Sequence, residues 1–357
     1  MKLFFDARYI TPGQHDGISR YSTELAKAVK DLHENTTFLI FDDFQKNRIP
    51  KNAKYLKIHK PTSWKEPFTA LVLNRFKPDV VFSPMQTIGS FGKKFKLVLT
   101  VHDLIYFRHN TPPKQFSWPV RFLWWVYHLS FIPESFLLNK ADMIATVSET
   151  TKNDILENKL TKKPIVITKN APTFFESKSV NRYDNPKNLI YMGSFIKYKN
   201  VETLIKSMRF LPEYKLHLLS RISEKRKQEM MSLSAEGSNI IFHNGVTDSE
   251  YHNLLLNNAI LVTASLDEGY GLPVAEALIN KVPAVVSDIP IFHEVAGPGA
   301  LYFSAKNPQD FARKIQQMQD EKTYQKIASS GYKYVKQFTW KDSARLLLDE
   351  IDSNLLK

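Results

Sequence analysis

The sequence predicts an α/β protein made of two doubly wound domains, and three observations support this fold class. Short runs of β-branched and aromatic residues alternate with longer helical patterns along the chain. Most of these runs are almost continuously apolar, which is typical of parallel strands covered by helices on both faces. A length of 357 residues also suits two domains of ordinary size.

The expected strands fall into two sets. The first set occupies residues 2–7, 37–42, 79–83, 96–102, 142–148 and 164–168. The second set occupies residues 188–193, 214–220, 239–245, 259–265 and 283–288. Between them, residues 169–187 are polar, contain two prolines and show no helical period, so we expect domains at 1–170 and 171–338. The leucines of residues 339–357 recur at helical spacing and predict a terminal helix.

Composition narrows the functional classes. The chain has no cysteine, which excludes disulfides, thiolate nucleophiles and cysteine-ligated zinc. Its net charge of +13 favours an anionic partner such as a nucleotide, a nucleic acid or an acidic lipid. The N-terminus reaches Asp6 and Arg8 too soon for a signal peptide, and no apolar run approaches the roughly 18 residues of a membrane span. A cytoplasmic protein is expected.

The segment "SLDEGYGLPVAEAL", residues 265–278, joins a strand to a helix. The run 259–265 predicts a buried strand, and Pro273 suits the first turn of the helix that follows. Open α/β sheets bind ligands outside the carboxyl ends of their strands, so this loop is a candidate binding site.

Its residue types suit a ligand with phosphates and hydroxyls. Gly269 and Gly271 allow the backbone to approach a ligand, and the free N–H groups of a helix start favour phosphate or hydroxyl oxygens. Glu276, one turn into the helix, suits both hydroxyls of a vicinal diol such as ribose. Glu268, in the loop, suits a group attached beyond the phosphates.

The string E-G-Y-G-L-P-x-x-E resembles the signature of the retaining glycosyltransferases of family four, in which two acids are separated by seven residues. "FDARYITPGQHDGISRYSTELAKAV" is similar to their first strand, glycine loop and first helix, and "VHDLIY" and "YMGSFIKYKNVETLIKSM" resemble further segments. The resemblance covers nearly the whole chain. It implies the GT-B fold of two facing Rossmann-like domains, with a C-terminal helix that packs back toward the first domain.

The resemblance also implies roles for individual residues. Glu268 would lie at the hexose, Glu276 would hold the ribose, and Lys199 would neutralise the departing diphosphate. The stretch between the two acids would offer backbone donors to the sugar and the diphosphate from Gly269, Tyr270, Gly271 and Leu272.

Other matching positions lie outside this loop. His102 would hydrogen bond the donor hexose, and Gly17 and Arg20 would lie near the donor phosphate or the acceptor. The family usually has arginine where this chain has Ser194 in the donor site, and Arg221 or Lys197 could replace that contact.

The implied reaction is a front-face transfer with retention at the anomeric carbon, in which no metal or other cofactor takes part. We expect a nucleotide-sugar donor, GDP-mannose before UDP-glucose, and a glycan or lipid-linked acceptor in surface polysaccharide or glycolipid synthesis. A GT-B hydrolase or epimerase, or an inactive scaffold that binds a nucleotide sugar, is the alternative. A nucleic-acid-binding protein is more distant, since the chain has no RNP, K-homology or zinc pattern, and no nucleic acid is expected.

Residues 112–138 combine tryptophans, phenylalanines and basic residues in a predicted helix. Such a helix can lie on an anionic membrane at the inner face of the cell membrane. It can equally pack its aromatic residues under the sheet. Periodicity does not distinguish the two, so both interpretations stay open.

Overall fold

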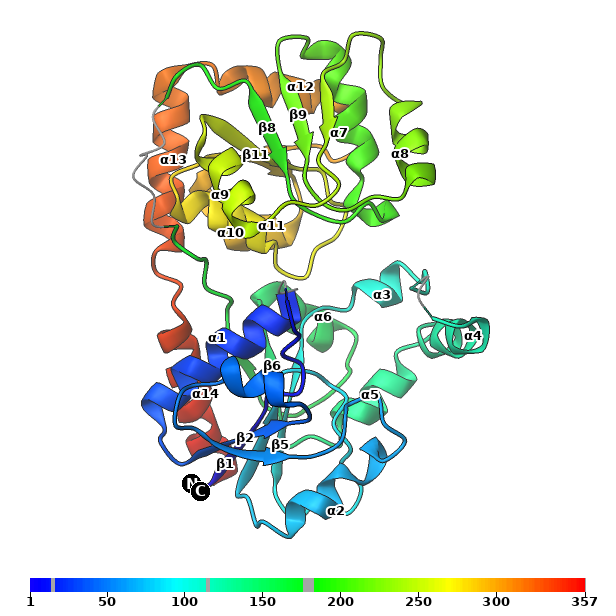
Figure 1. Cartoon of the computed structure of the whole chain (residues 1–357), viewed down its shortest axis with the longest axis vertical. Helices are drawn as coiled ribbons and strands as arrows, with labels where there is room; N and C mark the ends of the chain where they lie inside the picture. Colours follow the sequence, from blue (N-terminus) through cyan, green and yellow to red (C-terminus); the bar gives the residue numbers. More distant parts are fainter. Residues whose placement is uncertain (14–16, 114–115, 176–182, 357) are drawn as a thin grey trace. The chain divides into compact units, whose positions relative to one another are not determined.

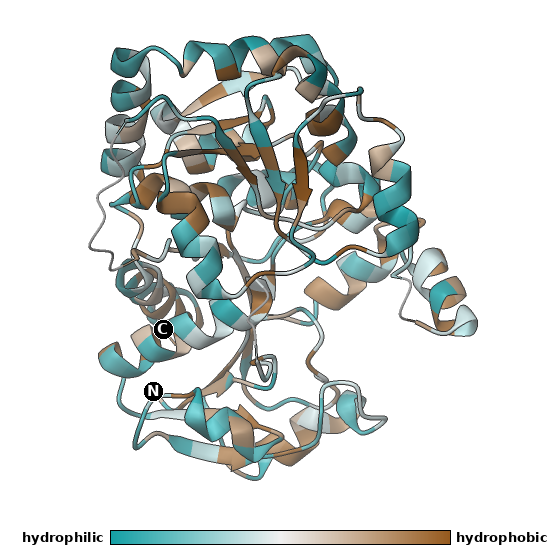
Figure 2. Cartoon of the chain, turned by 45° about the horizontal axis from the view of Figure 1, so that its top comes forward, coloured by the Kyte–Doolittle hydropathy of each residue, from teal (hydrophilic) through white to brown (hydrophobic). Residues whose placement is uncertain are grey.

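The computed structural model describes residues 1–13, 17–113, 116–175 and 183–356. The chain divides into two compact units. The N-terminal unit holds residues 1–170 together with 338–357, and the C-terminal unit holds residues 171–337. Each unit has one parallel sheet covered by helices, which confirms the predicted fold class (Figure 1). Coloured by hydropathy, the strands stand out as hydrophobic stretches between mixed helices (Figure 2).

The N-terminal sheet has seven strands in the order β3-β2-β1-β4-β5-β6-β7. The strands are β1 (Leu3–Asp6), β2 (Thr36–Ile40), β3 (Lys54–Lys57), β4 (Val80–Ser83), β5 (Lys96–Val101), β6 (Met143–Thr146) and β7 (Ile165–Ile167). Phe5 of β1 pairs in register with Phe38 and Phe82 on either side. All four residues of β1 are buried, because the strand has neighbours on both edges and helices on both faces.

Helices form a layer on each face of this sheet. They are α1 (Gly17–Leu32), α2 (Thr69–Asn74), α3 (Ile105–Arg108), α4 (Trp118–Tyr127), α5 (Ile132–Leu138), α6 (Glu149–Glu157) and α14 (Trp340–Leu355), with short 3-10 turns η1 (Asp43–Asn47) and η2 (Glu66–Phe68). Ala70, Leu73, Leu138 and Ile155 anchor α2, α5 and α6 in one apolar core. Figure 1 draws α1 and α14 on the opposite side of the sheet.

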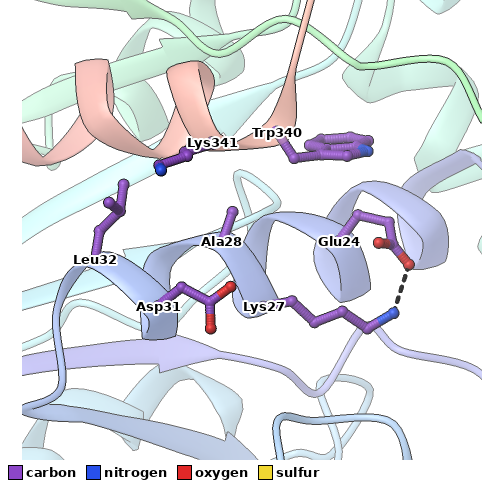
Figure 3. Close-up of a pocket in the computed structure, with 7 residues that line it drawn as sticks. All are labelled: Glu24, Lys27, Ala28, Asp31, Leu32, Trp340 and Lys341. Carbon is purple, nitrogen blue, oxygen red and sulfur yellow. Dashed lines mark hydrogen bonds and ion pairs between the residues drawn. The ribbon is translucent and has the colours of Figure 1, made fainter.

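Helix α14 packs along α1. In the chain, the 167 residues of the C-terminal unit separate α14 from the rest of the N-terminal unit. The ring of Trp340 meets Tyr21 edge to face at 5.9 Å, and the buried Tyr21 hydroxyl bonds to Thr168 at 2.6 Å. A pocket of about 350 Å³ remains between the two helices (Figure 3). It is lined by Glu24, Lys27, Ala28, Asp31, Leu32, Trp340 and Lys341.

The C-terminal sheet has six strands in the order β10-β9-β8-β11-β12-β13. The strands are β8 (Asn188–Tyr191), β9 (Lys215–Leu218), β10 (Ile240–Phe242), β11 (Ala259–Thr263), β12 (Ala284–Ser287) and β13 (Ala300–Phe303). The helices are α7 (Val201–Ser207), α8 (Glu224–Met231), α9 (Asp248–Leu256), α10 (Leu272–Ile279), α11 (Pro290–Ala296), α12 (Pro308–Gln317) and α13 (Glu321–Val335), with η3 (Lys197–Lys199), η4 (Met208–Phe210) and η5 (Gly297–Gly299).

The strand order of this sheet reverses at β8. Strand β8 lies between β9, which follows it in the chain, and β11, which begins the second half of the sheet. Open α/β sheets bind ligands at the carboxyl edge beside such a reversal, so the loops after β8 and β11 are the candidate site.

Two details differ from the sequence-based prediction. The expected strands omit the edge strands β3 and β13. Residues 112–138, predicted as one helix, form α4 and α5 instead, because Pro133 lies in the first turn of α5 and cannot continue a helix that begins before it. Residues 114 and 115 of this segment lie outside the described residues.

Candidate functional site

Two loops meet at the switch point of the C-terminal sheet. The loop after β8 contains η3, and the loop after β11 leads to α10. Leu266 N–H donates to the Tyr198 carbonyl at 2.7 Å. The Asn200 side chain donates to the carbonyls of Ala264 at 3.0 Å and Ala305 at 2.6 Å. These bonds hold the two predicted binding loops together.

The structure pairs two of the predicted site residues directly. Lys199 Nζ lies 2.6 Å from Glu268 Oε1, and the side chains are only 15% and 16% exposed. Ser265 Oγ donates to the same carboxylate oxygen at 3.3 Å. This largely buried ion pair lies at the carboxyl edge of a parallel sheet. It combines an ammonium group, which can bind a phosphate, with a carboxylate, which can accept hydrogen bonds from sugar hydroxyls.

Gly271 begins the helix that follows. It is the N-cap of α10, with a φ of +91°, and Pro273 lies in the first turn. A Cβ atom at Gly271 would lie 2.8 Å from the Phe292 ring. Both the left-handed backbone and the neighbouring ring therefore require glycine here. Helix α10 therefore begins a few residues after Glu268 in the chain.

Glu276 and Tyr270 are both buried, with 4% and 6% of their surfaces exposed. Glu276 lies one turn into α10, as predicted. Burial raises the pKa of Tyr270, and the carboxylate of Glu294 adds to that shift. A buried, neutral phenol anchors the loop, whereas the preceding Gly269 is partly exposed and Gly271 is buried.

Asn280 at the end of α10 is a positioning residue that the sequence did not reveal. Its Oδ1 accepts from Phe175 N–H at 2.9 Å, and its Nδ2 donates to the carbonyls of Thr173 at 3.1 Å and Glu276 at 2.7 Å. The buried amide thus fastens residues 173–175 to the helix that carries Glu276. An isolated asparagine has no sequence signal for such a role.

The loop after β8 depends on a close approach at Gly193. A Cβ atom there would lie 2.7 Å from the Tyr191 hydroxyl, which donates to the Ser194 carbonyl at 2.8 Å. Gly193 N–H donates to Ser220 Oγ at 3.2 Å. Burial raises the pKa of Tyr191 well above its ordinary value, and the charge of Glu268 adds to this shift.

An arginine that no sequence motif indicates lies next to the residue that follows Ser194. Arg226 of α8 donates from Nε to the Phe195 carbonyl at 3.1 Å, and it forms ion pairs with Glu202 and Glu229. Arg221, the predicted substitute, is exposed and packs against Gly245. The guanidinium of Arg226 is therefore already paired with two carboxylates.

In the N-terminal unit, His102 directly follows β5. One ring nitrogen lies 2.8 Å from the Pro84 carbonyl, and the ring meets Tyr21 of α1 edge to face at 4.9 Å. Thr151 Oγ1 donates to the His102 carbonyl at 3.1 Å. The histidine is thus held at the carboxyl edge of its own sheet, against the helix that contains Gly17 and Arg20. Residues 14–16 of the glycine loop lie outside the described residues.

A buried ionic cluster lies at the end of β1. Arg8 contacts Asp6 at 2.8 Å and Glu66 at 2.7 Å, and His59 contacts Glu66 at 3.0 Å. Burial alone would lower the pKa of Arg8, but the two carboxylates outweigh it and raise that pKa. The cluster ties β1 to η2, and no motif in the sequence indicates it.

Within the described residues, no group of three or more histidine, aspartate or glutamate side chains has the arrangement of a metal site. In the same part of the chain, none of the helices combines the length and apolar character that crossing a bilayer requires.

Comparisons with known proteins agree with this architecture. The profile of glycosyltransferase family 4 matches residues 15–171, and the profile of glycosyl transferases group 1 matches residues 173–334. The O-antigen chain mannosyltransferase RfbU of Salmonella typhimurium is 29% identical over 251 residues, which cover 66% of this chain and 69% of that protein. The serotype-specific mannosyltransferase WbdA of Escherichia coli is 34% identical over 106 residues, 30% of this chain but only 13% of that protein.

Solved structures share the fold over almost the full length. Sucrose-phosphate synthase from Thermosynechococcus elongatus superposes with a TM-score of 0.74 at 17% identity, covering 99% of this chain and 98% of that one. Anabaena HepE in complex with UDP and glucose gives 0.72 at 15% identity, with coverage of 99% and 100%. WaaG, a glycosyltransferase involved in lipopolysaccharide biosynthesis, gives 0.66 at 13% identity, with coverage of 99% of both chains.

Proposed function

The chain belongs to the family-four glycosyltransferases of GT-B fold, and from that premise we propose that it is a retaining hexosyltransferase of surface polysaccharide synthesis. The proposed donor is a nucleotide sugar, GDP-mannose in preference to UDP-glucose, and the acceptor is a glycan or a lipid-linked glycan. The observation that carries the proposal is the Lys199–Glu268 pair, which lies at the switch point just before the glycine-capped helix of Glu276.

These residues support a division of labour along one donor. Glu276 would take the ribose hydroxyls, the N–H groups at the start of α10 would meet the diphosphate, and Glu268 would meet the hexose hydroxyls. Lys199 would turn from Glu268 toward the phosphates as negative charge develops there. A preorganised cation of this kind commonly accounts for about 3 kcal/mol of barrier lowering.

The proposed reaction exchanges two bonds at the anomeric carbon. The bond from this carbon to the diphosphate oxygen breaks while the acceptor oxygen bonds from the same side of the ring. The acceptor proton passes to a phosphate oxygen of the departing nucleoside diphosphate. Lys199 and the start of α10 would compensate the leaving charge, so the scheme assigns no step to a metal.

The preference for mannose rests on relatives. RfbU and WbdA are both named as mannosyltransferases, whereas the HepE structure contains UDP and glucose. GDP-mannose is therefore the first donor to test and UDP-glucose the second.

The test measures protection against thermal unfolding by GDP-mannose, UDP-glucose, UDP-N-acetylglucosamine and dTDP-rhamnose. A ligand at 100 times its dissociation constant adds about 2.7 kcal/mol, enough to see as a rise in melting temperature. We expect GDP-mannose to give the largest rise, and Glu276→Gln to reduce it. The proposal would be wrong if no donor protected the chain. The anomeric configuration of the product, read by NMR, then tests retention.

We also propose that α4 rests on the anionic inner face of a membrane and brings a lipid-linked acceptor to the N-terminal unit. Helix α4 buries none of its residues. Trp118 is 79% exposed, Leu123 67% and Phe122 57%. The alternative of a core helix does not fit α4, since the aromatic residues of this helix do not lie under the sheet.

A further inference from the structure

A second exposed apolar surface lies in the same unit, around α2. We call it the α2 patch; it consists of Trp64, Phe68, Leu71 and Phe91. Trp64 is 78% exposed and Phe91 66%, with Phe68 at 48% and Leu71 at 43%. Large apolar side chains this exposed and this close together on a folded unit commonly mark an interaction surface.

The α2 patch is built on a fixed backbone. The rings of Phe68 and Phe91 meet edge to face at 6.2 Å. Asn74 donates from Nδ2 to the Gly92 carbonyl at 2.8 Å, and its Oδ1 accepts from Lys94 N–H at 2.9 Å. The loop that carries Phe91 is thus fastened to α2, so the patch presents one rigid surface.

The α2 patch and the α4–α5 segment lie over the same face of the N-terminal sheet. Ala70 of α2 and Leu138 of α5 belong to one core cluster. The outer sides of these helices expose Leu71 at 43%, and Ile132 and Phe136 at 77% and 67%. On the opposite layer, the described part of α1 and α14 exposes only Leu346 among large apolar side chains. Most of the exposed apolar surface therefore lies on one side, where Figure 1 draws α2, α5 and α4.

The exposed charges of the two segments around α2 and α4–α5 are positive, whereas α6 on the same face carries the acids Glu149, Asp154 and Glu157. Between residues 60 and 77 the only acid is Glu66, which is buried against Arg8. Between residues 104 and 141 the only acid is Glu134, which is fully buried and accepts from the Tyr127 hydroxyl at 2.8 Å. Among the described residues of these two ranges, the exposed cationic side chains include Lys60, Lys65, Arg75, Lys77, Arg121 and Lys140.

Lysines and aromatic rings are mixed within the two surfaces. Lys65 Nζ lies 5.7 Å from the centre of the Trp64 ring, and Lys140 Nζ lies 4.4 Å from that of Phe136. A bilayer interface with anionic headgroups accepts both groups at the same depth, with rings at the acyl boundary and ammonium groups at the phosphates. A protein partner would not need this uniform sign of charge over two separate surfaces.

We propose that the α2 patch and α4 together dock the N-terminal unit on one anionic lipid bilayer. This inference rests on the membrane contact proposed above for α4 and adds a second attachment, which would fix the orientation of the sheet to the bilayer. Two weak contacts on one rigid unit reinforce each other, because the second binds at high local concentration once the first is made.

The test measures sedimentation of the full chain with phosphatidylglycerol vesicles and with phosphatidylcholine vesicles. We compare wild type with Trp64→Ser/Phe91→Ser, with Trp118→Ser/Leu123→Ser, and with the control Met231→Ser/Leu346→Ser, whose side chains are 42% and 43% exposed elsewhere. We expect binding to phosphatidylglycerol, and a loss of about tenfold or more in affinity for each patch variant. The control should bind like wild type, and raising the salt from about 0.1 to 0.5 M should weaken binding.

Three results would overturn the inference. The first is an α2-patch variant that binds vesicles as tightly as wild type. The second is a wild type that ignores anionic vesicles. The third is a concentration-dependent dimer, seen by light scattering, that the α2-patch substitutions abolish, because the patch would then belong to a second copy of the chain. Trp64→Phe should retain vesicle binding where Trp64→Ser loses it.

The same variants separate this inference from sugar transfer. All of them should keep the thermal protection by donor, because their substitutions lie outside the C-terminal unit or, for Met231, on an exposed part of α8. If donor protection is absent in wild type while the vesicle pattern holds, the transferase proposal fails and the docking surface stands.

Discussion

Gly271→Ala should destabilise the C-terminal unit through two separable effects. The left-handed backbone at φ +91° costs an alanine about 1–2 kcal/mol. The new Cβ would lie 2.8 Å from the Phe292 ring, and relieving such an overlap in a packed core costs about 1–3 kcal/mol more. The sum is about 2–5 kcal/mol, which lowers the melting temperature of a unit this size by about 4–20 °C.

Gly237→Ala is the matched control for this prediction. Gly237 has a φ of +78°, but its added Cβ would meet no atom within 4 Å. Calorimetry should therefore show a loss of only about 1–2 kcal/mol for the control. Adding Phe292→Leu to Gly271→Ala should recover part of its loss, since it removes the ring that the Cβ meets. Equal losses at the two glycines, or purely additive effects of the Phe292 change, would refute the steric argument.

Three further predictions concern charged groups. Lys199→Met should lower the transfer rate about 100- to 1000-fold in single-turnover assays. The control, exposed Lys206→Met, should change the rate little. If both variants transferred sugar at the same rate, Lys199 would have no role in the reaction. Arg8→Met removes the buried cation from Asp6 and leaves Glu66 with its contact to His59. Urea unfolding should show a loss of about 3–5 kcal/mol, against about 0.5 kcal/mol or less for exposed Arg75→Met. Burial, with a neighbouring histidine and lysine, lowers the pKa of His217 to about 4. As the pH falls, His217 is therefore protonated in the unfolded chain before it is protonated in the folded one. The free energy of unfolding should fall by about 1–2 kcal/mol between pH 6.5 and 4, and His217→Gln should abolish this part of the pH dependence.

Much of the fold could be predicted because buried parallel strands appear in the sequence as continuous apolar runs. Eleven such runs correspond to strands in the two sheets. They include the edge strands β7 and β10, but the other two edge strands, β3 and β13, were missed. A strand that is partly exposed gives a weaker apolar signal than one buried on both faces. Strand β3 reads "KYLK" and exposes both lysines, and β13 leaves Leu301 and Tyr302 partly exposed.

The candidate site was predictable only where residues lie close together in the sequence. The loop with Glu268 and the helix with Glu276 follow from one strand-loop-helix pattern. The roles of Asn280 and Arg226 depend on partners that lie far away in the sequence, such as Thr173 and Phe195. Nothing in the local sequence selects these two from the other asparagines and arginines of the chain.

The exposure of the apolar side chains of α4 could likewise not be predicted from the sequence. An aromatic helix has the same period whether it faces a core, a partner or a lipid surface. Only the tertiary structure shows that the apolar side chains of α2, α4 and α5 are exposed over one face of one sheet.

The return of α14 to the N-terminal unit has a consequence for biogenesis. The C-terminal unit is inserted within the N-terminal one, so it can be completed on the ribosome while the first unit still lacks its last helix. At a translation rate of about 5–20 residues per second, one side of α1 would stay uncovered for roughly 10–40 s before α14 is synthesised. A stop codon just before residue 338 would thus leave the later-made unit whole and the earlier-made one unfinished.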